Sequence, residues 1–439
     1  MSFWKIAWRN MQQRALASSL TGLSMALGVA LMILVIVVYG VVVDQLENDA
    51  QGYNLIVGGK GGSLQLVLNT VFHLDKPLYP IPYSYYKRFV DGDLAPYTEV
   101  AIPYCLGDSF VGGGQVFRVV ATTPDLFERL PYGANEDGTE QNYEFADGRN
   151  FKTENFFEAV VGSRVARKCG LKVGDLFEPT HGLGSAGDKH RQFKIVGVLK
   201  RTGTANDRAL FANMEGFYLL EGHALTPEPV EGQPTPPTIP PPDENGNPRP
   251  LPEAQREVTS ILVRCKDSFG AQILDTQINK GKDRIAQAVA PRYQVQRLQD
   301  SFVKPVQMVL MVLTVLIVIV AGISILVSIY NSMAERAHDI AVMRALGASR
   351  NAVMSIVLVE SILLSLLGGL AGVLIGHTVL ALAAPVVEEH AGVAVSFWDF
   401  NWQEALLVPG LVAFASLVGF MPAMTAYRTD VGRALGGGR

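Results

Sequence analysis

Two histidines and one carboxylate lie close together in a glycine-rich stretch of this sequence. His181 and His190 are the first and last residues of the segment HGLGSAGDKH, and Asp188 lies between them. Imidazole and carboxylate groups are the usual ligands of Zn²⁺, and imidazole also suits Cu²⁺. The spacing matches no established ligand motif, however, and a solvated hairpin tip that carries two histidines explains the same residues. His181 and His190 therefore stand as a metal-site hypothesis, with the hairpin tip as the favoured alternative.

One acidic residue, Glu360, lies inside a long apolar stretch. A carboxylate within a membrane segment is a functional hypothesis by default, for example as part of a proton or ion relay. Glu360 follows Arg350 by ten residues, however, which is about 15 Å along a helix. We therefore favour an ion pair with Arg344, Arg350 or Arg428 near the inner surface. His377, further along the same stretch, is expected at the outer interface.

The chain lacks the sequence motifs of common hydrolases and nucleotide-binding proteins. It contains no HExxH and no GxSxG, and its GGKGGS segment (Gly58–Ser63) lacks the spacing of a P-loop. Its three cysteines (Cys105, Cys169 and Cys265) are too few for a disulfide scaffold, and its net charge of −4 gives no general attraction to nucleic acid. We therefore predict no catalytic residue, no cofactor in this chain and no nucleic-acid partner, which argues against a membrane-anchored enzyme.

The elements that position these residues are mainly membrane helices. Of the 439 residues, 49% are hydrophobic and only 18% are charged. Four stretches contain no Asp, Glu, Lys or Arg, and each is longer than the roughly 20 residues that a helix needs to cross a bilayer. These stretches are residues 15–43, 305–334, 361–387 and 405–427. We predict four transmembrane helices, because the first stretch is too long for the alternative, a cleaved signal peptide.

The charges beside these stretches indicate the orientation of the chain. Basic residues gather before the first stretch, between the second and third, and after the fourth: Lys5, Arg9, Arg14, Arg336, Arg344, Arg350, Arg428, Arg433 and Arg439. Acidic residues follow the first and third stretches: Asp44, Glu47, Asp49, Glu388, Glu389 and Asp399. Because Lys and Arg are enriched in cytoplasmic loops, both termini are predicted to be cytoplasmic and residues 44–304 to lie outside.

The long segment between the first two helices has a mixed α+β pattern. Alternating apolar residues predict strands at Gln115–Thr123, Arg191–Leu199 and Val258–Cys265, a short helix at Ser163–Gly170 and a longer helix at Leu274–Ala290. Residues 222–252 hold 11 of the 24 prolines and almost no large apolar side chain. We predict an extended, solvated insertion there that joins no core, and a proline-rich ligand for a partner is the alternative.

Small residues recur at four-residue steps on two of the apolar stretches. Gly368, Gly372 and Gly376 form such a row on the third, and the first carries Gly22 and Ala26 within a similar row. Small residues let membrane helices pack closely. Contact within one chain and contact between two copies both fit this pattern.

Two short segments next to the membrane are amphipathic. Residues 2–14 combine Trp4 and Trp8 with basic residues, as expected of a helix on the membrane surface. In the loop after the second stretch, Ile340, Met343 and Leu346 recur at three-residue steps. We predict that this loop forms a helix that docks into a groove of a partner, while a helix lying on lipid is the alternative.

The same loop carries the most specific motif of the chain. The run from Glu335 to Gly376 resembles the FtsX-like/MacB-like permease family of ABC transporters, whose signature ER-x-x-x-I-x-x-x-R-A-x-G-A-S stands at the cytoplasmic end of the second helix. Its places are filled here by Glu335, Arg336, Ile340, Arg344, Ala345, Gly347, Ala348 and Ser349, with Glu360 following. The tail PAMTAYRTDVGRAL, the start WKIAWRNMQQRALAS and the exterior segment AVVGSRVARKCGLKVGD are also similar to the family.

The resemblance implies a membrane α-helical fold with four transmembrane helices and a large α+β extracytoplasmic domain between helices 1 and 2. The expected parts are a cytoplasmic amphipathic helix (1–16), membrane helices (17–43, 305–333, 352–387 and 405–427), the extracytoplasmic domain (44–304), a cytoplasmic coupling helix (334–351), an outer loop (388–404) and a cytoplasmic tail (428–439). By analogy, the extracytoplasmic domain divides into a membrane-proximal part (44–107 and 256–304) and a distal part (108–255) with the proline-rich insertion (222–252), which is unusual for the family.

The resemblance also implies a role without catalysis in this chain. Two permease copies, identical or different, are expected to pair in the plasma membrane on two P-loop ATPase subunits that bind ATP and Mg²⁺ and come from another polypeptide. The ATPase-coupling residues would be Glu335, Arg336, Ile340, Arg344, Ala345 and Gly347. Family members export peptides or macrolides, release lipoproteins or control cell-wall hydrolases, so an envelope or periplasmic partner is a further expectation. A signalling or scaffold protein that regulates an envelope enzyme, without transport, remains the alternative.

Overall fold

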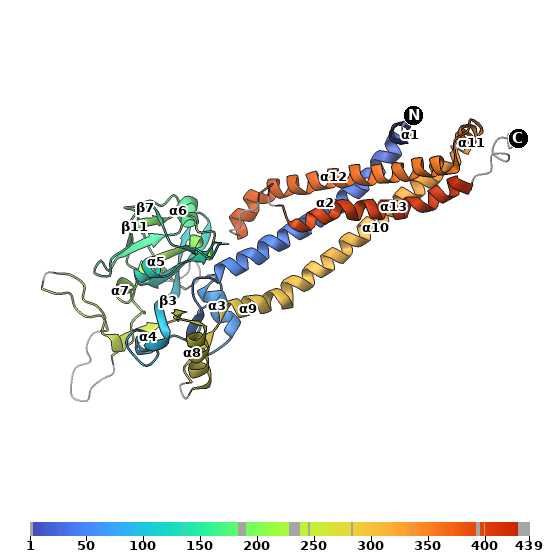
Figure 1. Ribbon diagram of the computed structural model, residues 1–439. Coiled ribbons are helices and arrows are strands. Elements are labelled where there is room, and N and C mark those ends of the chain that lie inside the picture. The colour runs from blue at the N-terminus through green and yellow to red at the C-terminus, as the bar shows by residue number, and fades with distance from the viewer. Residues whose placement is uncertain are drawn as a thin grey trace. The chain divides into compact units, whose positions relative to one another are not determined.

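The chain forms two compact units. The computed structural model describes residues 3–135, 137–182, 190–227, 238–244, 246–281, 284–335, 337–391, 396–398 and 400–428. One unit combines Met1–Val43 with Asp300–Arg439, and the other comprises Asp44–Gln299. We call them the helical unit and the exterior unit, and we describe each by itself (Figure 1).

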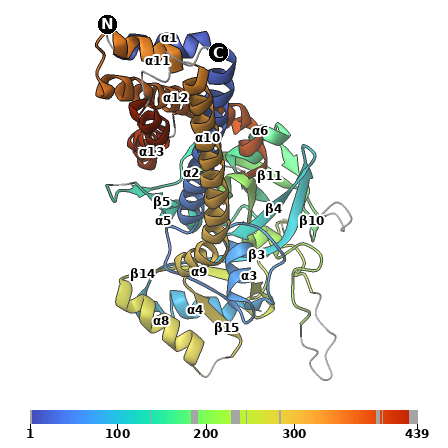
Figure 2. The ribbon, with the colours of Figure 1, turned by 90° about the vertical axis from the view of Figure 1, so that its right-hand side faces the viewer.

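The helical unit is built from long apolar helices. Its elements are α1 (Phe3–Gln13), α2 (Ala15–Asp49, whose last residues belong to the exterior unit), α10 (Lys304–Glu335), α11 (Ala337–Ala345), α12 (Arg350–Ala391), η5 (Trp402–Leu406) and α13 (Leu407–Arg428). Within the part of the chain that the structure describes, four helices are long and apolar enough to cross a membrane: α2, α12, α13 and the helix that includes α10. The predicted number of membrane helices is thereby confirmed. The short helices α1 and α11 lie at the same end of this unit (Figure 2).

Each membrane helix buries one side and exposes another. On α2, Met25, Val29 and Ile33 recur every four residues and are 0–1% exposed, whereas Leu23 and Leu27 are at least half exposed. A helix that is apolar all round and half exposed is suited to lipid rather than to water. The buried sides of α2, α10, α12 and α13 form one core, which also takes in Ile340 of α11.

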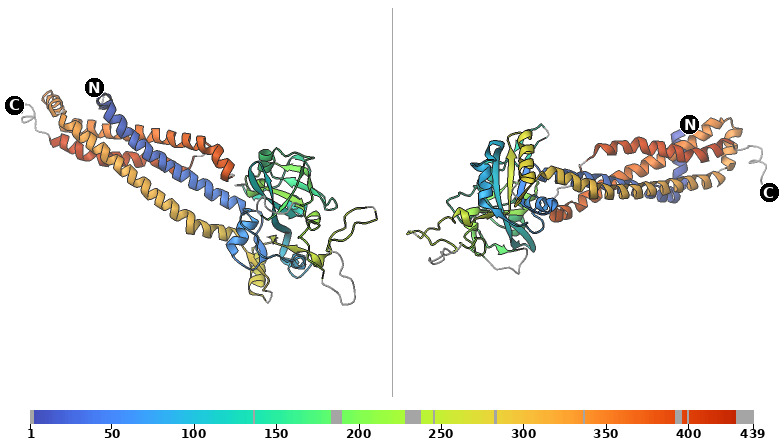
Figure 3. Two further views of the ribbon diagram at one scale, coloured as in Figure 1. Left: turned by 180° about the vertical axis from the view of Figure 1, so that it is seen from behind. Right: turned by 90° about the horizontal axis from the view of Figure 1, so that it is seen from below.

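The exterior unit is organised around one mixed sheet of 11 strands, in the order β15-β1-β14-β3-β4-β12-β8-β11-β7, with β10 on β3 and β9 on β11. Figure 3 shows strands of this unit from two sides. Their bounds are β1 (Leu55–Gly59), β3 (Thr98–Gly112), β4 (Gln115–Thr122), β7 (Phe145–Gly148), β8 (Glu158–Val161), β9 (Leu176–Phe177), β10 (Thr180–His181), β11 (Phe193–Leu199), β12 (Ala209–Asn213), β14 (Ser260–Cys265) and β15 (Ala286–Val289).

Helices and two small sheets complete this unit. The small sheets pair β2 (Ile81–Pro82) with β13 (Glu257–Val258) and β5 (Gly133–Ala134) with β6 (Glu140–Gln141). The helices are α3 (Ser63–Thr70), α4 (Tyr83–Val90), α5 (Asp125–Arg129), α6 (Ser163–Cys169), α7 (Met214–Phe217), α8 (Ser268–Lys280) and α9 (Pro291–Leu298), with single turns η1 (Ala95–Tyr97), η2 (Ala205–Arg208) and η3 (Glu253–Gln255); a π-helical turn, η4 (Gln299–Val303), begins at the end of the unit.

The main sheet is buried on both faces. Along β4, Phe117, Val119 and Ala121 pack into one hydrophobic cluster, while Val120 packs into another on the opposite face. Because successive side chains of a strand point to opposite faces, this alternation places one core on each side of the sheet. The expected α+β exterior is confirmed in its mixture of strands and helices.

Two expectations for the exterior need correction. The helix predicted at Leu274–Ala290 ends at Lys280, and β15 follows, because Gly281 interrupts the helix and the short apolar run Ala286–Val289 completes the sheet edge beside β1. The proline-rich insertion is not free of core contacts, since Leu251 is only 1% exposed and packs into a hydrophobic cluster. Residues 228–237 and 245 of this insertion lie outside the described residues. The short helix that starts at Ser163 is confirmed.

Candidate functional site

The family motif of the chain falls on α11 and the turn after it. Two backbone hydrogen bonds cap the end of the helix: Ala348 N donates to Met343 O (3.0 Å), and Gly347 N donates to Arg344 O (3.1 Å). Gly347 has a φ of +101°, a left-handed conformation that favours glycine. The motif therefore builds a short helix with a sharp stop, from which the chain turns into α12.

The three residues of the predicted apolar stripe on α11 lie in different environments. Ile340 is 5% exposed and lies in the core of the helical unit, Met343 is half-buried, and Leu346 is 84% exposed. At 3.6 residues per turn, Leu346 lies about 120° around the helix from Ile340, so three-residue steps do not keep these side chains aligned. The exposed face of this helix instead combines Val342 with the residues of its C-terminal turn, Ala345, Leu346 and Gly347.

The other predicted coupling residues divide into two groups. Arg344 is half-buried on α11. The side chain of Glu335 and the whole of Arg336 lie outside the described residues. Of the predicted set, Ala345 and Gly347 are thus exposed, whereas Ile340 packs α11 against the helices of its own chain.

Glu360 lies where four helices of the helical unit meet. It is 8% exposed and lines a cavity of about 200 Å³ together with Asn10 and Gln13 of α1, Ser332 of α10 and Met343 of α11. The buried carboxylate of Glu360 therefore has polar neighbours from α1 and α10 in this cavity. Of the basic residues proposed as its partners, Arg350 stacks on the ring of Tyr427, 5.7 Å from the ring centroid.

His377 is a buried residue of α12. It is 1% exposed, and its Nε2 lies 2.9 Å from Oε2 of Glu404. The other oxygen of Glu404 accepts a hydrogen bond from the backbone N–H of Asn401, in a capping box that begins η5. The ring of Phe400 packs 4.4 Å from the histidine ring. This pair joins α12 to the start of α13.

The glycine row of α12 packs against α2 of the same chain. A Cβ added at Gly372 would lie 2.6 Å from the carbonyl oxygen of Ala26 and 2.7 Å from Cβ of Val29, and one at Gly368 would lie 2.9 Å from the carbonyl oxygen of Gly22. A Cβ at Gly376 would also come within 3.0 Å of Ile33. Only glycine allows the two backbones to approach this closely. A Cβ at Gly22 itself would meet nothing within 4 Å.

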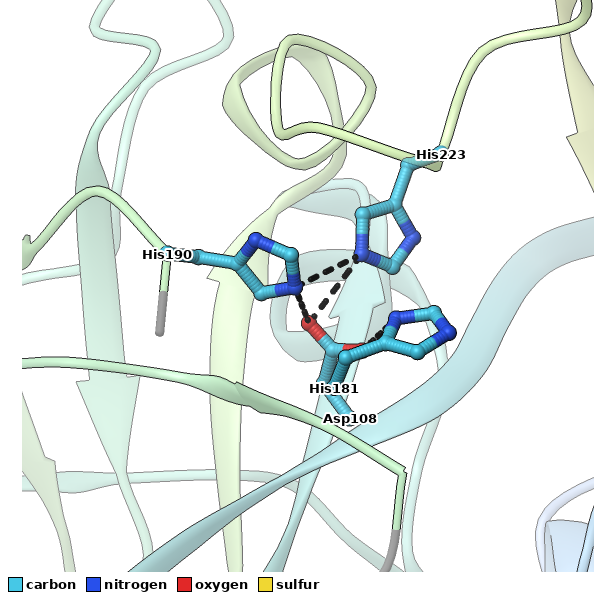
Figure 4. Close-up of side chains that lie close together, drawn as sticks. All are labelled: Asp108, His181, His190 and His223. Carbon is cyan, nitrogen blue, oxygen red and sulfur yellow. Dashed lines mark hydrogen bonds and ion pairs between the residues drawn. The ribbon is translucent and has the colours of Figure 1, made fainter. Parts of the chain in front are cut away.

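The structure brings His181 and His190 together in the exterior unit, as the metal-site hypothesis requires. Two residues that the sequence did not suggest, Asp108 and His223, complete the group (Figure 4). One ligand atom from each of the four lies within 4.8 Å of the others. Asp188, the carboxylate considered from the sequence, lies outside the described residues. Since Asp108 and His223 are distant from the histidine loop in sequence, no local spacing could have revealed them.

Two family models match this chain, and the first spans part of both structural units. Residues 18–279 match the model of the MacB-like periplasmic core domain, and residues 311–430 match that of the FtsX-like permease C-terminal domain. An uncharacterized ABC transporter permease of Methanocaldococcus jannaschii is 23% identical over 66% of this chain and 64% of its own length. The uncharacterized ABC transporter permease YknZ of Bacillus subtilis is 32% identical over 33% of this chain and 36% of its own length.

A further relative carries both permease and ATP-binding functions in its name. The macrolide export ATP-binding/permease protein MacB of Photorhabdus laumondii is 28% identical over 40% of this chain, and the match covers 27% of the relative. The chain thus spans less than two thirds of the length of these relatives. With one domain model covering more than half of the chain, four apolar helices and a sheet-rich exterior, this protein belongs to the family of ABC transporter permeases with MacB-like periplasmic core and FtsX-like permease domains.

Proposed function

We propose that this chain is the permease subunit that couples ATP hydrolysis by a separate cytoplasmic ATPase to motion of its extracytoplasmic domain. The observation that carries the proposal is the two-sided packing of α11. Its inner side, with Ile340, is part of the core of the helical unit, while Val342 and Leu346 are exposed. A partner that displaces α11 from its exposed side would therefore also displace the membrane helices against which Ile340 packs.

The neighbouring polar cavity extends this connection. Glu360 shares its cavity with residues of α1, α10 and α11, so a shift of α11 changes the surroundings of a carboxylate within the membrane helices. Buried polar groups are costly when their partners move away, which makes such a cavity suited to switching between two discrete arrangements. We assign Glu360 to this structural link between helices rather than to an ion relay.

ATP and Mg²⁺ belong to the partner in this proposal, because the sequence contains no P-loop. The excess of basic residues beside α1, α11 and the end of α13 supports a cytoplasmic location for these elements and both termini, with the exterior unit on the other side of the plasma membrane. A second permease copy completes the assembly. The cargo belongs to the classes that exporters of this family handle, as in the relative named for macrolide export.

Substitutions at the exposed Leu346 and at the half-buried Arg344 of the motif test the proposal. Leu346→Glu and Arg344→Glu are introduced into the full chain, which is co-expressed with the P-loop ATPase of its host and purified in detergent. We expect both variants to lose co-purification and stimulation of the ATPase, since an acidic residue replaces an apolar or basic contact. Leu176→Glu, at a leucine of β9 that is 56% exposed, is the matched control.

Two results would contradict the assignment. If Leu346→Glu stimulates the ATPase as the unmodified chain does, then α11 is not the docking element. If no P-loop ATPase co-purifies with the unmodified chain while an envelope protein does, a signalling or scaffold role takes precedence over coupling.

A further inference from the structure

We propose that Asp108, His181, His190 and His223 form a binding site for one divalent transition-metal ion, Zn²⁺ by its geometry. The site lies wholly within the exterior unit, between β3, β10 and the segment that follows α7. The inference does not depend on the coupling mechanism, which assigns this unit only a movement.

Three of the four ligand atoms already form one face of a tetrahedron. Nε2 of His190 and Nε2 of His223 lie 3.3 Å apart, and Oδ2 of Asp108 lies 3.5 Å from the first and 3.3 Å from the second. A tetrahedral Zn²⁺ with bonds of 2.0–2.1 Å separates its ligands by about 3.3 Å. One ion at bonding distance from all three atoms therefore fits without movement of the backbone.

The fourth histidine approaches the same carboxylate from another side. Nδ1 of His181 lies 3.4 Å from Oδ1 of Asp108. This nitrogen reaches the fourth position of the tetrahedron after a small rotation of an exposed ring, since the side chain is 57% exposed. The other three side chains are at most 9% exposed, so the ion would reach the site from the side of His181.

The carboxylate of Asp108 needs a cation. Its side chain is fully buried, and neither oxygen has a hydrogen-bond partner among the described residues. A buried charge without compensation is costly. Arg118 on the neighbouring strand β4 exerts an electrostatic influence on this carboxylate, but no ion pair within 4.0 Å joins the two. Three imidazoles and a carboxylate that converge on one point supply the donor set typical of a zinc site, whereas hard ions such as Mg²⁺ and Ca²⁺ prefer oxygen ligands.

The fold holds each ligand in place before any ion binds. His181 stands directly opposite Asp108 in the β10–β3 ladder. The next residue, Gly182, accepts a hydrogen bond from Ser109 Oγ (2.7 Å) and donates to the carbonyl of Gly107 (3.0 Å). These contacts place His181 and Asp108 side by side.

The other two histidines have anchors of their own. The backbone N–H of His190 donates to the carbonyl of Pro179 (3.0 Å), and the ring of His223 packs on Phe217 at a centroid distance of 4.2 Å. Metal ligands that are oriented by their surroundings bind more tightly than free side chains do. Because His223 lies at the start of the proline-rich insertion, a bound ion would link the start of that insertion to the central sheet.

Metal titration of the full-length protein in detergent tests the proposal. The protein is stripped with a chelator, and binding of Zn²⁺ is measured by calorimetry and by elemental analysis after desalting. We expect about one equivalent of Zn²⁺, no competition from Mg²⁺, and the visible absorption of tetrahedral coordination after replacement by Co²⁺. Cu²⁺ is titrated separately, because imidazole ligands also bind it strongly and the ligand set alone does not decide between the two ions.

Four single variants identify the ligands. Asp108→Asn, His190→Ala and His223→Ala are each expected to weaken Zn²⁺ binding at least about tenfold, since even substitutions beyond the first ligands reach that size. His181→Ala removes an exposed side chain, so it leaves the fold intact and tests the fourth position even if a buried variant fails to fold. Asp147→Asn, at an exposed carboxylate of β7, and His73→Gln, at a histidine outside the cluster, are the matched controls.

The proposal fails if the unmodified protein binds no Zn²⁺ or Cu²⁺ at micromolar concentration. It also fails if folded variants of the cluster bind the ion as tightly as the two controls do. Tight binding of Cu²⁺ without the cobalt spectrum would overturn the assignment to a tetrahedral zinc site.

Discussion

The glycine row of α12 makes a sharp prediction about how the membrane helices are held together. Gly372→Ala places a methyl group 2.6 Å from the carbonyl oxygen of Ala26 and 2.7 Å from Cβ of Val29, where ordinary contacts are 3.4–4 Å. Neither atom can rotate away, because one belongs to the backbone and the other is attached directly to it. The two helices must therefore separate by about 1 Å, which also loosens the contacts at Gly368 and Gly376.

The size of the effect follows from two opposing contributions. Overpacking of this kind typically costs about 1–3 kcal/mol, and the better helix propensity of alanine returns up to about 1 kcal/mol. We expect a net loss of about 1–2 kcal/mol for Gly372→Ala and a larger loss for Gly372→Val. Gly22→Ala is the matched control, because a Cβ there meets nothing within 4 Å and only the gain in propensity remains.

Thermal unfolding of the full chain in detergent measures the difference. Gly372→Ala should melt at a lower temperature than the unmodified chain, and Gly22→Ala at an equal or higher one. Under the proposed function, Gly372→Ala should also reduce stimulation of the partner ATPase, since α11 is continuous with the helices that this seam joins. Equal melting of the two variants would refute the packing argument. A more severe defect in Gly22→Ala would instead place a second copy of the chain against α2.

Two further predictions concern histidines inside the two units. Burial lowers the pKa of His73 to about 4, from about 6.5 in an unfolded chain, so the unfolded state binds the extra proton and stability present above pH 6.5 is lost as the pH falls toward 4. At pH 5 the loss from His73 is about 2 kcal/mol, and chemical unfolding at pH 7 and pH 5 should show that His73→Gln changes the difference in stability between the two pH values by this amount. Glu404→Ala leaves His377 without this hydrogen-bond partner and removes the capping box. The melting temperature should therefore fall, with a loss of about 1 kcal/mol or more in the free energy of unfolding. An unchanged melting temperature would show that the pair does not contribute to stability.

Local patterns in the sequence predicted the parts of the structure that depend on local physics. The length of an apolar run decides whether a helix can cross a bilayer, so all four membrane helices were predictable from composition alone. The helix at Ser163–Cys169 was predictable because Gly170 terminates it in a left-handed conformation, with a φ of +69°. The helix predicted to continue past Lys280 was wrong, because Ala286–Val289 pairs with β1, and such pairing with a distant segment leaves no local signal.

Contacts between distant segments account for what the sequence could not show. The four-residue steps of Gly368, Gly372 and Gly376 predicted close packing, but the partner helix follows only from the three-dimensional contacts with α2. Asp108 and His223 escaped notice for the same reason. A lone aspartate in a strand and a lone histidine after a turn are unremarkable until β3 and the segment after α7 converge.

One strand, β3, connects the two halves of the exterior unit. Its first part pairs with β14, and through it with β1 and β15, which come from the two ends of the insertion between the membrane helices. Its second part pairs with β4 and β10, which belong to the middle of that insertion. The two sets of strands are therefore joined through β3, whose pairing with β4 shifts in register between Leu106 and Ser109.

Asp108 lies in this second part of β3, close to where the strand passes from one set of partners to the other. An ion held by Asp108 and the three histidines would tie β3, β10 and the start of the proline-rich insertion into one rigid body. Metal binding would therefore stiffen the exterior unit at the strand through which both of its halves are joined. If the proposed coupling and the proposed metal site are both correct, metal occupancy determines how closely β4 and β10 move together with β1, β14 and β15.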